Sequence, residues 1–409
     1  MTTAPKVALL LETSTEYGRG LLRGIVRYAQ LNGPWSIHIS PGHLGQALPR
    51  AKTWRGHGVI ARIRSSAMAR TIRASGLPVV ASSLEEFAHK GDLSGFCEIR
   101  TDSPRIARMA AEHLVERELK NFAFCGFRGV QWSSSREKVF RETLAEQGLA
   151  CRAHRIEMPS WAQQPDWIRS YEREQPGLVD WLKSLPVPVG LMACNDICGH
   201  EVLLACAAAG LRVPDDVAII GVDNDELLCG LSDPPLSSVA LNLEHAGYEA
   251  ASALDEMMAG RVPQQQIIAV EPTIVVARRS TEVVSANDPV VAAAVRFIRD
   301  HAGRVIDVPH VVRETGISRR TLERRFALSR GRSVLAEITR CRLERAKRLL
   351  LETDLPVYRV AERSGFQNVK TFIRSFQMVE GESATDFRVR LAAEQMKQRR
   401  RTRTNGSQA

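Results

Sequence analysis

Amide and carboxylate side chains follow two short apolar runs in the first 280 residues. Asn195 and Asp196 come just after Gly190–Ala193, and Asp223 comes directly after Val217–Val222. Short apolar runs bounded by polar residues are typical of buried strands, and open parallel sheets bind ligands at the carboxyl ends of their strands. Such side chains suit a small polyol, because each hydroxyl group offers one donor and one acceptor. The pattern predicts a site for a ligand such as a sugar.

A second group of residues carries chemistry that suits DNA. Asp307–Phe326 and Pro356–Arg390 each read as a helix, a glycine-containing turn and a second helix with a cationic face. Arginine can donate two hydrogen bonds to guanine, and glutamate can accept one from cytosine. Two such helix-turn-helix units predict contact with two neighbouring major-groove sites of double-stranded DNA. The predicted contact residues are Ser318, Arg319, Arg320, Glu323 and Arg324 in the first unit, and Asn368, Val369, Lys370, Thr371 and Arg374 in the second.

The segment between these units predicts one continuous helix over Ser333–Leu351. A helix of this length spans about 28 Å, close to the ~34 Å repeat of B-DNA. It could therefore hold two reading helices one turn of the duplex apart. The residues expected on its buried face are Leu335, Ile338, Leu343, Ala346, Leu349 and Leu350.

The charge is divided unevenly along the 409 residues, whose formal net charge is +10. Residues 289–409 hold 26 Lys and Arg against 13 Asp and Glu, whereas residues 1–288 hold 30 against 33. A basic module joined to a near-neutral one indicates that the module alone binds a polyanion.

Residues 6–280 alternate short apolar runs with amphipathic stretches, which favours two α/β halves with Rossmann-like parallel sheets and late segments that cross back. We therefore expect a two-lobed domain at residues 1–283, a linker at 284–288, an all-α domain at 289–392 and a basic, disordered tail at 393–409. The expected strands are Lys6–Leu11, Trp35–Ser40, Gly58–Ile63, Pro78–Ser82, Asn121–Gly126, Gly190–Ala193 and Val217–Val222, and the expected helices include Gly20–Asn32, Pro104–Arg117, Arg136–Gln147, Ile197–Ala209 and Asn242–Met258.

The cysteines and the hydropathy pattern exclude several classes of protein. The eight cysteines form no C-x-x-C pair and no zinc set, so we expect free, buried thiols and no metal or cofactor. The N-terminal apolar run Val7–Leu11 is too short for a signal peptide, and no run approaches the ~20 apolar residues of a membrane span. A cytoplasmic protein without membrane contact is expected.

The C-terminal segment carries a specific signature in Val360-Ala361, Gly365-Phe366, Phe372-Ile373-Arg374-Ser375-Phe376, Gly381 and Phe387-Arg388. In these residues it resembles the AraC/XylS-type DNA-binding domain. Lys370-Thr371 stands where that family usually has Ser-Tyr, and Ala384 where it usually has Pro. These departures concern the preferred DNA sequence rather than the fold.

The stretch Ala193–Glu226, followed by Pro234–Val239, resembles the LacI-type, periplasmic-binding-protein-like effector domain. In that family the ligand is met by the Asn of an Asn-Asp motif, the Asp of a Gly-x-Asp motif and an Arg near the start of a helix. The resemblance carries these roles to Asn195, Asp223 and Arg136.

Four further ligand contacts are predicted from their positions. Tyr17 and Arg19 belong to the loop after the first strand, Arg62 follows Gly58–Ala61, and Trp132 could stack on the apolar face of a sugar. Arg19 and Arg62 fit surface ion pairs equally well. Asp196 and Asn224 are better explained as helix caps or turn formers.

With a LacI-type sensor ahead of an AraC-type reader, the whole chain resembles the xylose-responsive transcription activators. The resemblance implies a small sugar as effector and no catalysis. The implied partners are a double-stranded DNA operator with two half-sites and RNA polymerase, and we expect the protein to be a homodimer. Two alternatives stay open: a transport-type sugar-binding protein, and a sugar or nucleotide enzyme that uses Asp223 or His200 as a base. The absent export signal opposes the first, and the lack of a nucleophile set or a phosphate loop opposes the second.

Overall fold

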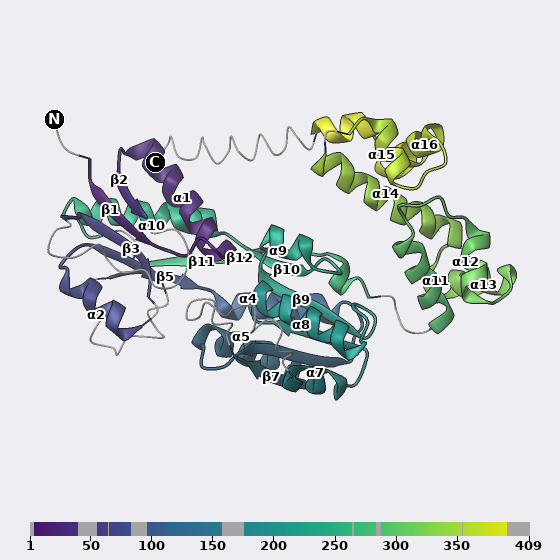
Figure 1. The fold of residues 1–409 in the computed structure, drawn as a ribbon, viewed down its shortest axis with the longest axis horizontal. Coiled ribbons are helices and arrows are strands. Elements are labelled where there is room, and N and C mark those ends of the chain that lie inside the picture. Colours follow the sequence, from purple (N-terminus) through teal and green to yellow (C-terminus); the bar gives the residue numbers. More distant parts are fainter. Residues whose placement is uncertain are drawn as a thin grey trace. The chain divides into compact units, whose positions relative to one another are not determined.

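The chain folds into two compact units, Met1–Val283 and Val284–Ala409 (Figure 1). The structure, a computed structural model, describes residues 4–39, 55–63, 65–82, 96–157, 176–263, 266–283, 288–353 and 355–390. Residues 284–287 of the expected linker and the whole expected tail at 393–409 lie outside the described residues.

The first lobe of the first unit is built on a six-stranded parallel sheet. Side chains alternate between its faces: Val7 and Leu9 face one core, and Ala8 and Leu10 face the other. The strand order is β11 (Ile267–Val270), β5 (Cys97–Thr101), β4 (Val79–Ser82), β3 (Gly58–Arg62), β1 (Lys6–Leu10) and β2 (Ser36–Ile39).

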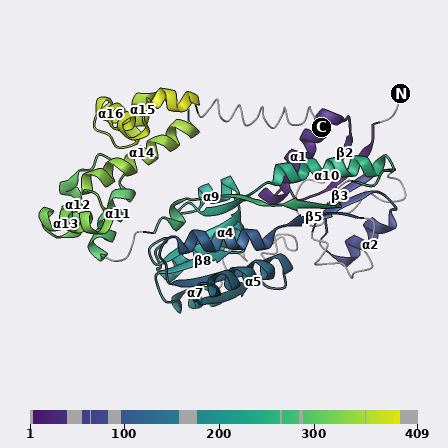
Figure 2. The same ribbon diagram turned by 180° about the vertical axis from the view of Figure 1, so that it is seen from behind.

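Two helices from distant parts of the chain cover one face of this sheet. They are α1 (Glu16–Asn32) and α10 (Leu243–Met258), which lie side by side, and α2 (Ser66–Ala74) covers the other face (Figures 1 and 2). Gly24 and Gly247 allow the two backbones to approach closely, because a Cβ atom at either position would collide with the facing helix. The late segment α10 is thereby fixed to the first lobe.

The second lobe holds another sheet, in which six strands are described; its β10–β12 pair is antiparallel and the other described pairs are parallel. Its strand order is β12 (Pro272–Val276), β10 (Ser237–Leu241), β9 (Val217–Asp223), β8 (Val189–Ala193), β6 (Asn121–Phe127) and β7 (Cys151–Ile156). Neighbouring helices on the sheet are α4 (Ser103–Val115) with α5 (Gln131–Ala145), and α7 (Pro176–Lys183) with α8 (Asp196–Ala209), while the short α9 (Glu226–Leu231) follows β9.

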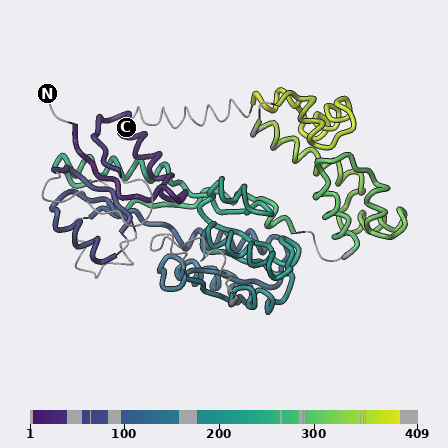
Figure 3. The backbone as a smooth tube through the Cα atoms, in the orientation of Figure 1, coloured from purple at the N-terminus to yellow at the C-terminus, as the bar shows by residue number. Residues whose placement is uncertain are grey.

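The chain crosses between the lobes at Thr101–Ser103, Leu241–Leu243 and Val270–Pro272 (Figure 3). Helix α10 and strand β11 thus return to the first lobe before β12 joins the second. The prediction of two lobes with parallel sheets and late segments that cross back is confirmed.

Several elements differ from the sequence-based expectation. Strands β5 and β7 were not predicted, because CEIRT and CRAHRI interleave charged and apolar residues and contain no apolar run. Helix α5 begins at Gln131, five residues before the predicted start at Arg136, because Ser133–Ser135 are helical rather than a loop.

The second unit is entirely helical within its described residues. It contains two helix-turn-helix units, α12 (Val308–Thr315) with α13 (Arg319–Arg330), and α15 (Val357–Arg363) with α16 (Val369–Glu380). Gly316 and Gly365 take φ values of 66° and 76° in the two turns, a region that favours glycine. Each helix-turn-helix unit has its own apolar core, and α11 (Pro289–Asp300) packs into the core of the first. The prediction of two helix-turn-helix units is confirmed.

Helix α14 (Val334–Glu352) joins the two cores, close to the predicted Ser333–Leu351. Ile338 belongs to the first core, whereas Leu343 and Leu350 belong to the second. The expectation of a buried Leu335 is wrong, because the adjacent Val334 takes the core position and Leu335 is 57% exposed.

Candidate functional site

A cavity of about 320 Å³ lies between the two lobes of the first unit. Strand ends from both lobes meet there: Arg62 ends β3 and Thr101 ends β5 in the first lobe, while Asp223 ends β9 and Asn195 follows β8 in the second. This is the edge at which open α/β sheets bind ligands. Its lining residues are Thr15, Tyr17, Arg62, Glu98, Ile99, Arg100, Thr101, Ser103, Pro104, Gln131, Trp132, Ser135, Arg136, Asn195 and Asp223.

Six of the seven residues that the sequence suggested for ligand contact line this cavity, namely Tyr17, Arg62, Trp132, Arg136, Asn195 and Asp223. They come from five separate segments of the chain, and the fold brings them together. The seventh, Arg19, is not among the lining residues. Its Nη2 donates instead to Oδ2 of Asp225 at 2.6 Å, across the two lobes.

Arg136 forms a cationic wall of the cavity. Its side chain is buried, donates to the carbonyl oxygen of Cys194, and places its guanidinium 5.0 Å from the ring centroid of Trp132. Within the part of the chain that the structure describes, its buried Nε has no hydrogen-bond partner. A buried donor without a partner destabilises the fold by about 1–3 kcal/mol, which a ligand oxygen would relieve.

Asp223 provides the facing anionic group. Burial is the main cause that raises the pKa of Asp223, to about 6, and the positive charges of Arg136 and Arg62 partly oppose it. Its backbone has φ 102°, a strained value for a residue with a side chain. Strain and a shifted pKa at one residue are typical of a binding position.

Tyr17 and Arg62 line the cavity from the first lobe. The guanidinium of Arg62 lies 5.0 Å from the ring centroid of Tyr17, and it also forms an ion pair with Glu12. The Tyr17 hydroxyl lies 3.2 Å from Oγ1 of Thr101. Burial raises the pKa of Tyr17, so the phenol stays protonated and can donate to a ligand.

Asn195 lines the cavity and also has a role in the fold. Its Oδ1 caps α8 by accepting from the backbone N of Cys198 at 3.0 Å. The amide nitrogen is then the group that Asn195 can offer to a ligand acceptor. Asp196 is held by the fold, since its oxygens accept from Ser238 and from the backbone of Asp225 at 2.6 and 2.7 Å.

Sequence reasoning missed the part of the cavity wall that β5 provides, Glu98 to Thr101. Alternating apolar and polar residues in CEIRT were the available signal. It also missed Thr15, Gln131 and Ser135, which lie in a loop or on the first turns of α5. His200, considered above as a base, is not among the lining residues and bonds to Ser232 Oγ at 3.1 Å.

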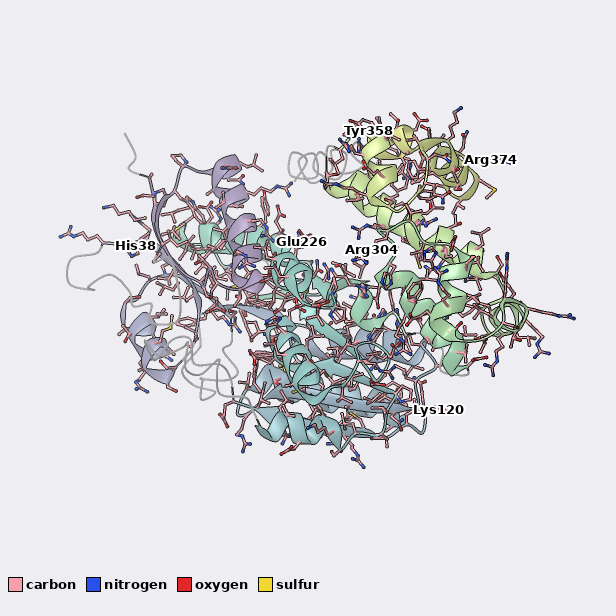
Figure 4. All side chains as sticks on the ribbon, turned by 45° about the vertical axis from the view of Figure 1, so that its right-hand side comes forward. His38, Lys120, Glu226, Arg304, Tyr358 and Arg374 are labelled. Atoms are coloured by element: carbon pink, nitrogen blue, oxygen red, sulfur yellow. The ribbon has the colours of Figure 1, made fainter. Side chains whose placement is uncertain are left out.

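The reading helices of the second unit present the predicted cationic side chains to solvent. Arg319, Arg320 and Arg324 are exposed on α13, and Lys370 and Arg374 are exposed on α16, where Figure 4 shows Arg374. Such exposure is what contact with bases or phosphates requires.

Three of the other predicted DNA contacts accept hydrogen bonds from backbone N–H groups within the unit. Ser318 caps α13 by accepting from the N of Thr321 at 3.3 Å, and Asn368 caps α16 by accepting from the N of Thr371 at 2.8 Å. Glu323 is half-buried and accepts from the backbone N of Val334 at 3.2 Å, which fixes the start of α14.

Val369 packs partly against the second core, and the Thr371 hydroxyl lies 2.8 Å from Oδ1 of Asn368. Val369 and Glu323 therefore present less free surface than the arginines do.

The two helix-turn-helix units are braced by more than α14. An ideal Cβ at Gly365 would lie 2.5 Å from the carbonyl oxygens of Ala302 and Arg304, so the second turn packs directly on the loop before α12. Arg342 of α14 donates to the carbonyl of Ile306 at 2.6 Å. The relative orientation of the reading helices is fixed by these contacts.

The described residues also give information on metal sites and membrane-spanning helices. Among the described residues, no group of three or more His, Cys, Asp and Glu side chains is placed to hold a metal ion. No helix in the described part of the chain is long and apolar enough to span a membrane.

Comparison with known proteins supports both units. Residues 111–281 match the periplasmic binding protein-like domain family, and residues 311–390 match a helix-turn-helix domain family. The chain is 30% identical over 390 residues to the xylose operon regulatory protein of Escherichia coli K12, covering 94% of this chain and 96% of that protein. It is 28% identical over 379 residues to the protein of that name from Haemophilus influenzae, covering 91% and 95%.

A solved structure of the xylose-binding transcription activator xylR matches with a TM-score of 0.76 at 30% identity, covering 94% of this chain and 97% of that one. The fold and both sites thus define a DNA-binding transcription regulator with a periplasmic-binding-protein-like sensor, and not an enzyme. The chain belongs to the family of xylose operon regulatory proteins.

Proposed function

We propose that this protein activates transcription of a sugar-utilisation operon when a pentose, with xylose as the first candidate, binds in the cavity between the lobes. The observation that carries the proposal is the cavity itself, which joins donors and acceptors from both lobes in about 320 Å³. That volume is near the lower end of small-molecule sites, about 300–1,000 Å³, and suits a monosaccharide. Relatives over nearly the whole chain are named for xylose.

In this proposal the sugar lies between complementary groups. Asp223 accepts from one or two hydroxyls, while Arg136, Arg62 and Asn195 donate to ring or hydroxyl oxygens. The aromatic faces of Trp132 and Tyr17 cover apolar C–H surface, and they also hold the arginines in position. No single group selects one sugar, so selectivity comes from how many hydroxyls find partners at once.

Switching follows from the position of the ligand between the lobes. A sugar that contacts both lobes binds the closed arrangement better than the open one, and this difference in affinity shifts the population. Arg19 contributes through its ion pair with Asp225, which joins α1 to the turn after β9. Closure then favours DNA binding by the second unit.

In this proposal the protein acts in the cytoplasm as a homodimer. The homodimer binds two operator half-sites and recruits RNA polymerase. Each protomer offers two reading helices, so one half-site comprises two neighbouring major-groove segments. The proposed DNA contacts are Ser318, Arg319, Arg320, Glu323, Arg324, Asn368, Val369, Lys370, Thr371 and Arg374.

The test is a gel-shift titration of the full-length protein on the DNA upstream of its target operon, with and without sugars. Xylose, arabinose, ribose and glucose are compared at fixed salt, because DNA affinity depends steeply on ionic strength. We expect xylose to tighten specific binding by at least fivefold, within the usual range of allosteric coupling. If no sugar changes DNA affinity or half-site preference, the proposal fails.

A further inference from the structure

The turn Asp223–Asp225 touches three different parts of the first unit. Asp223 lines the cavity. Oδ2 of Asp225 accepts from Nη2 of Arg19 in the opposite lobe at 2.6 Å. Oδ1 of Asn224 accepts from Nη2 of Arg278 at 2.8 Å. Three consecutive residues therefore meet the ligand site, the other lobe and the end of the β12 segment.

This turn has an unusual backbone that its neighbours hold in place. Asp223 and Asn224 have φ values of 102° and 52°, which are unfavourable for residues that carry side chains. Ser238 Oγ accepts from the backbone N of Asn224 at 3.0 Å, and Asp196 Oδ2 accepts from that of Asp225 at 2.7 Å. Since a strained turn persists only while its partners hold it, a change in the cavity at Asp223 can alter its geometry.

The residues after β12, here called the exit segment (residues 278–283), are the last described residues of the first unit before the chain continues into the second. The segment is tightly anchored, because Ser280 and Thr281 are fully buried. Oγ1 of Thr281 lies 3.0 Å from Nε2 of His113, and its carbonyl accepts from Nε of Arg117 at 2.6 Å. A segment held in this way by α4 and by Arg117, just after its end, moves with the second lobe rather than independently of it.

Arg278 is the first residue of the exit segment, and its side chain reaches back to the turn. Its Nη1 donates to the carbonyl of Leu236 at 2.9 Å while its Nη2 donates to Asn224. Its backbone N donates to Oγ of Ser237 at 2.7 Å. One guanidinium thus ties the cavity turn, the start of β10 and the chain that continues into the DNA-binding unit.

We propose that Arg278 couples sugar binding to DNA binding, by transmitting the geometry of the Asp223–Asp225 turn to the exit segment through its bond to Asn224. The proposal rests on the function proposed above and identifies the residues that carry its signal. Arg278 is not among the residues that line the cavity, so it acts as a positioning residue and not as a ligand contact.

The test separates sugar affinity from coupling in the full-length protein. Xylose affinity is measured by calorimetry without DNA, and operator affinity by fluorescence anisotropy with and without saturating xylose. The variants are Arg278→Met, which removes the guanidinium, and Asn224→Gly, which removes the acceptor while tolerating φ 52°. Arg261→Met is the matched control, because Arg261 is exposed just after α10.

Both variants are expected to bind xylose within threefold of the wild type. They lose the enhancement of operator affinity, from at least about fivefold to below about twofold. The control keeps both quantities. The inference is overturned if the variants keep the full enhancement, or if they lose xylose binding in proportion, because Arg278 would then only support the cavity. A wild type without any sugar effect would instead refute the proposed function.

Discussion

Replacing Asp223 by asparagine is expected to stabilise the sugar-free protein and to weaken sugar binding. The substitution keeps the shape of the side chain and removes its charge. In the fold, burial raises the pKa of Asp223 from 3.8 to about 6, so the ionised form is disfavoured relative to the unfolded chain. A group with a raised pKa contributes stability that is present below the unfolded pKa and lost as the pH rises through about 6.

The magnitude follows from the size of this shift. Each pKa unit corresponds to about 1.4 kcal/mol, and allowing for partial solvent screening the charge of Asp223 costs on the order of 2 kcal/mol at pH 7.5. Asp223→Asn removes that cost, and the melting transition of the first unit rises. Hydrogen bonds to a charged acceptor contribute about 1.5–3 kcal/mol, so the variant binds xylose roughly 10- to 100-fold more weakly.

Two assays test this reasoning, scanning calorimetry of the full-length protein and xylose titration, each from pH 4.5 to 8. Wild-type affinity should fall below pH 6, approaching tenfold per unit, as the free carboxyl group becomes protonated. The affinity of Asp223→Asn should not vary there, and the stability difference should vanish near pH 4. Asp180→Asn is the control, since that side chain is exposed in the same lobe. A variant that melts below the wild type at pH 7.5 would refute the argument.

Three further predictions concern the DNA-binding unit. Arg374→Ala should weaken operator binding by about 1–3 kcal/mol and relax base preference, whereas an equal loss on random DNA in competition assays would indicate a phosphate contact only. Gly365→Ala should lower the unfolding free energy by about 1–3 kcal/mol more than Gly381→Ala does. Both glycines have φ 76°, but of the two only an alanine at 365 would place its Cβ 2.5 Å from backbone carbonyl oxygens. Glu337→Gln should destabilise the unit by about 2–3 kcal/mol in thermal melts near pH 7, since it removes a fully buried carboxylate that pairs with three arginines. Burial alone would raise the pKa of Glu337, but the arginines hold it below its usual value, so this contribution is present above about pH 4.5 and lost as the pH falls.

Strand ends were the part of the candidate site that the sequence made predictable. Asn195 and Asp223 follow apolar runs that are fully buried as β8 and β9, and parallel strands bring their carboxyl ends to one edge. A single apolar run followed by a polar residue was therefore enough to predict that this residue lies at the ligand-binding edge of the sheet. Arg136 needed the family resemblance, because the sequence around it does not distinguish a buried cationic wall from an exposed helix face.

The residues that were missed depend on contacts between distant segments. Glu98 and Arg100 lie on β5, a strand whose charged residues pair with each other and which gains its place only between β4 and β11. Strand β11 comes from residues 267–270, so the alternation in CEIRT could indicate a strand but not its neighbours in the sheet or its place in the cavity wall. Arg19 shows the same limit, since its partner Asp225 lies 206 positions away. The sequence near Arg19 therefore could not show whether this residue contacts a ligand or forms an ion pair.

The DNA-binding unit shows why a long helix alone cannot set the relative orientation of two reading helices. Helix α14 fixes the spacing along its axis, but rotation of the second helix-turn-helix unit about that axis would turn α16 away from the groove. Two contacts oppose this rotation: the turn at Gly365 rests on the carbonyls of Ala302 and Arg304, and Arg342, which bonds to Ile306, also places its guanidinium 5.7 Å from the ring centroid of Phe366 in the second turn. Backbone-to-backbone packing of this kind admits no side chain at Gly365, so the glycine serves both the φ of its own turn and the angle between the units. An operator whose two major-groove segments are separated by one extra base pair should therefore bind much more weakly, because the protein cannot rotate one reader by the roughly 35° that the insertion demands.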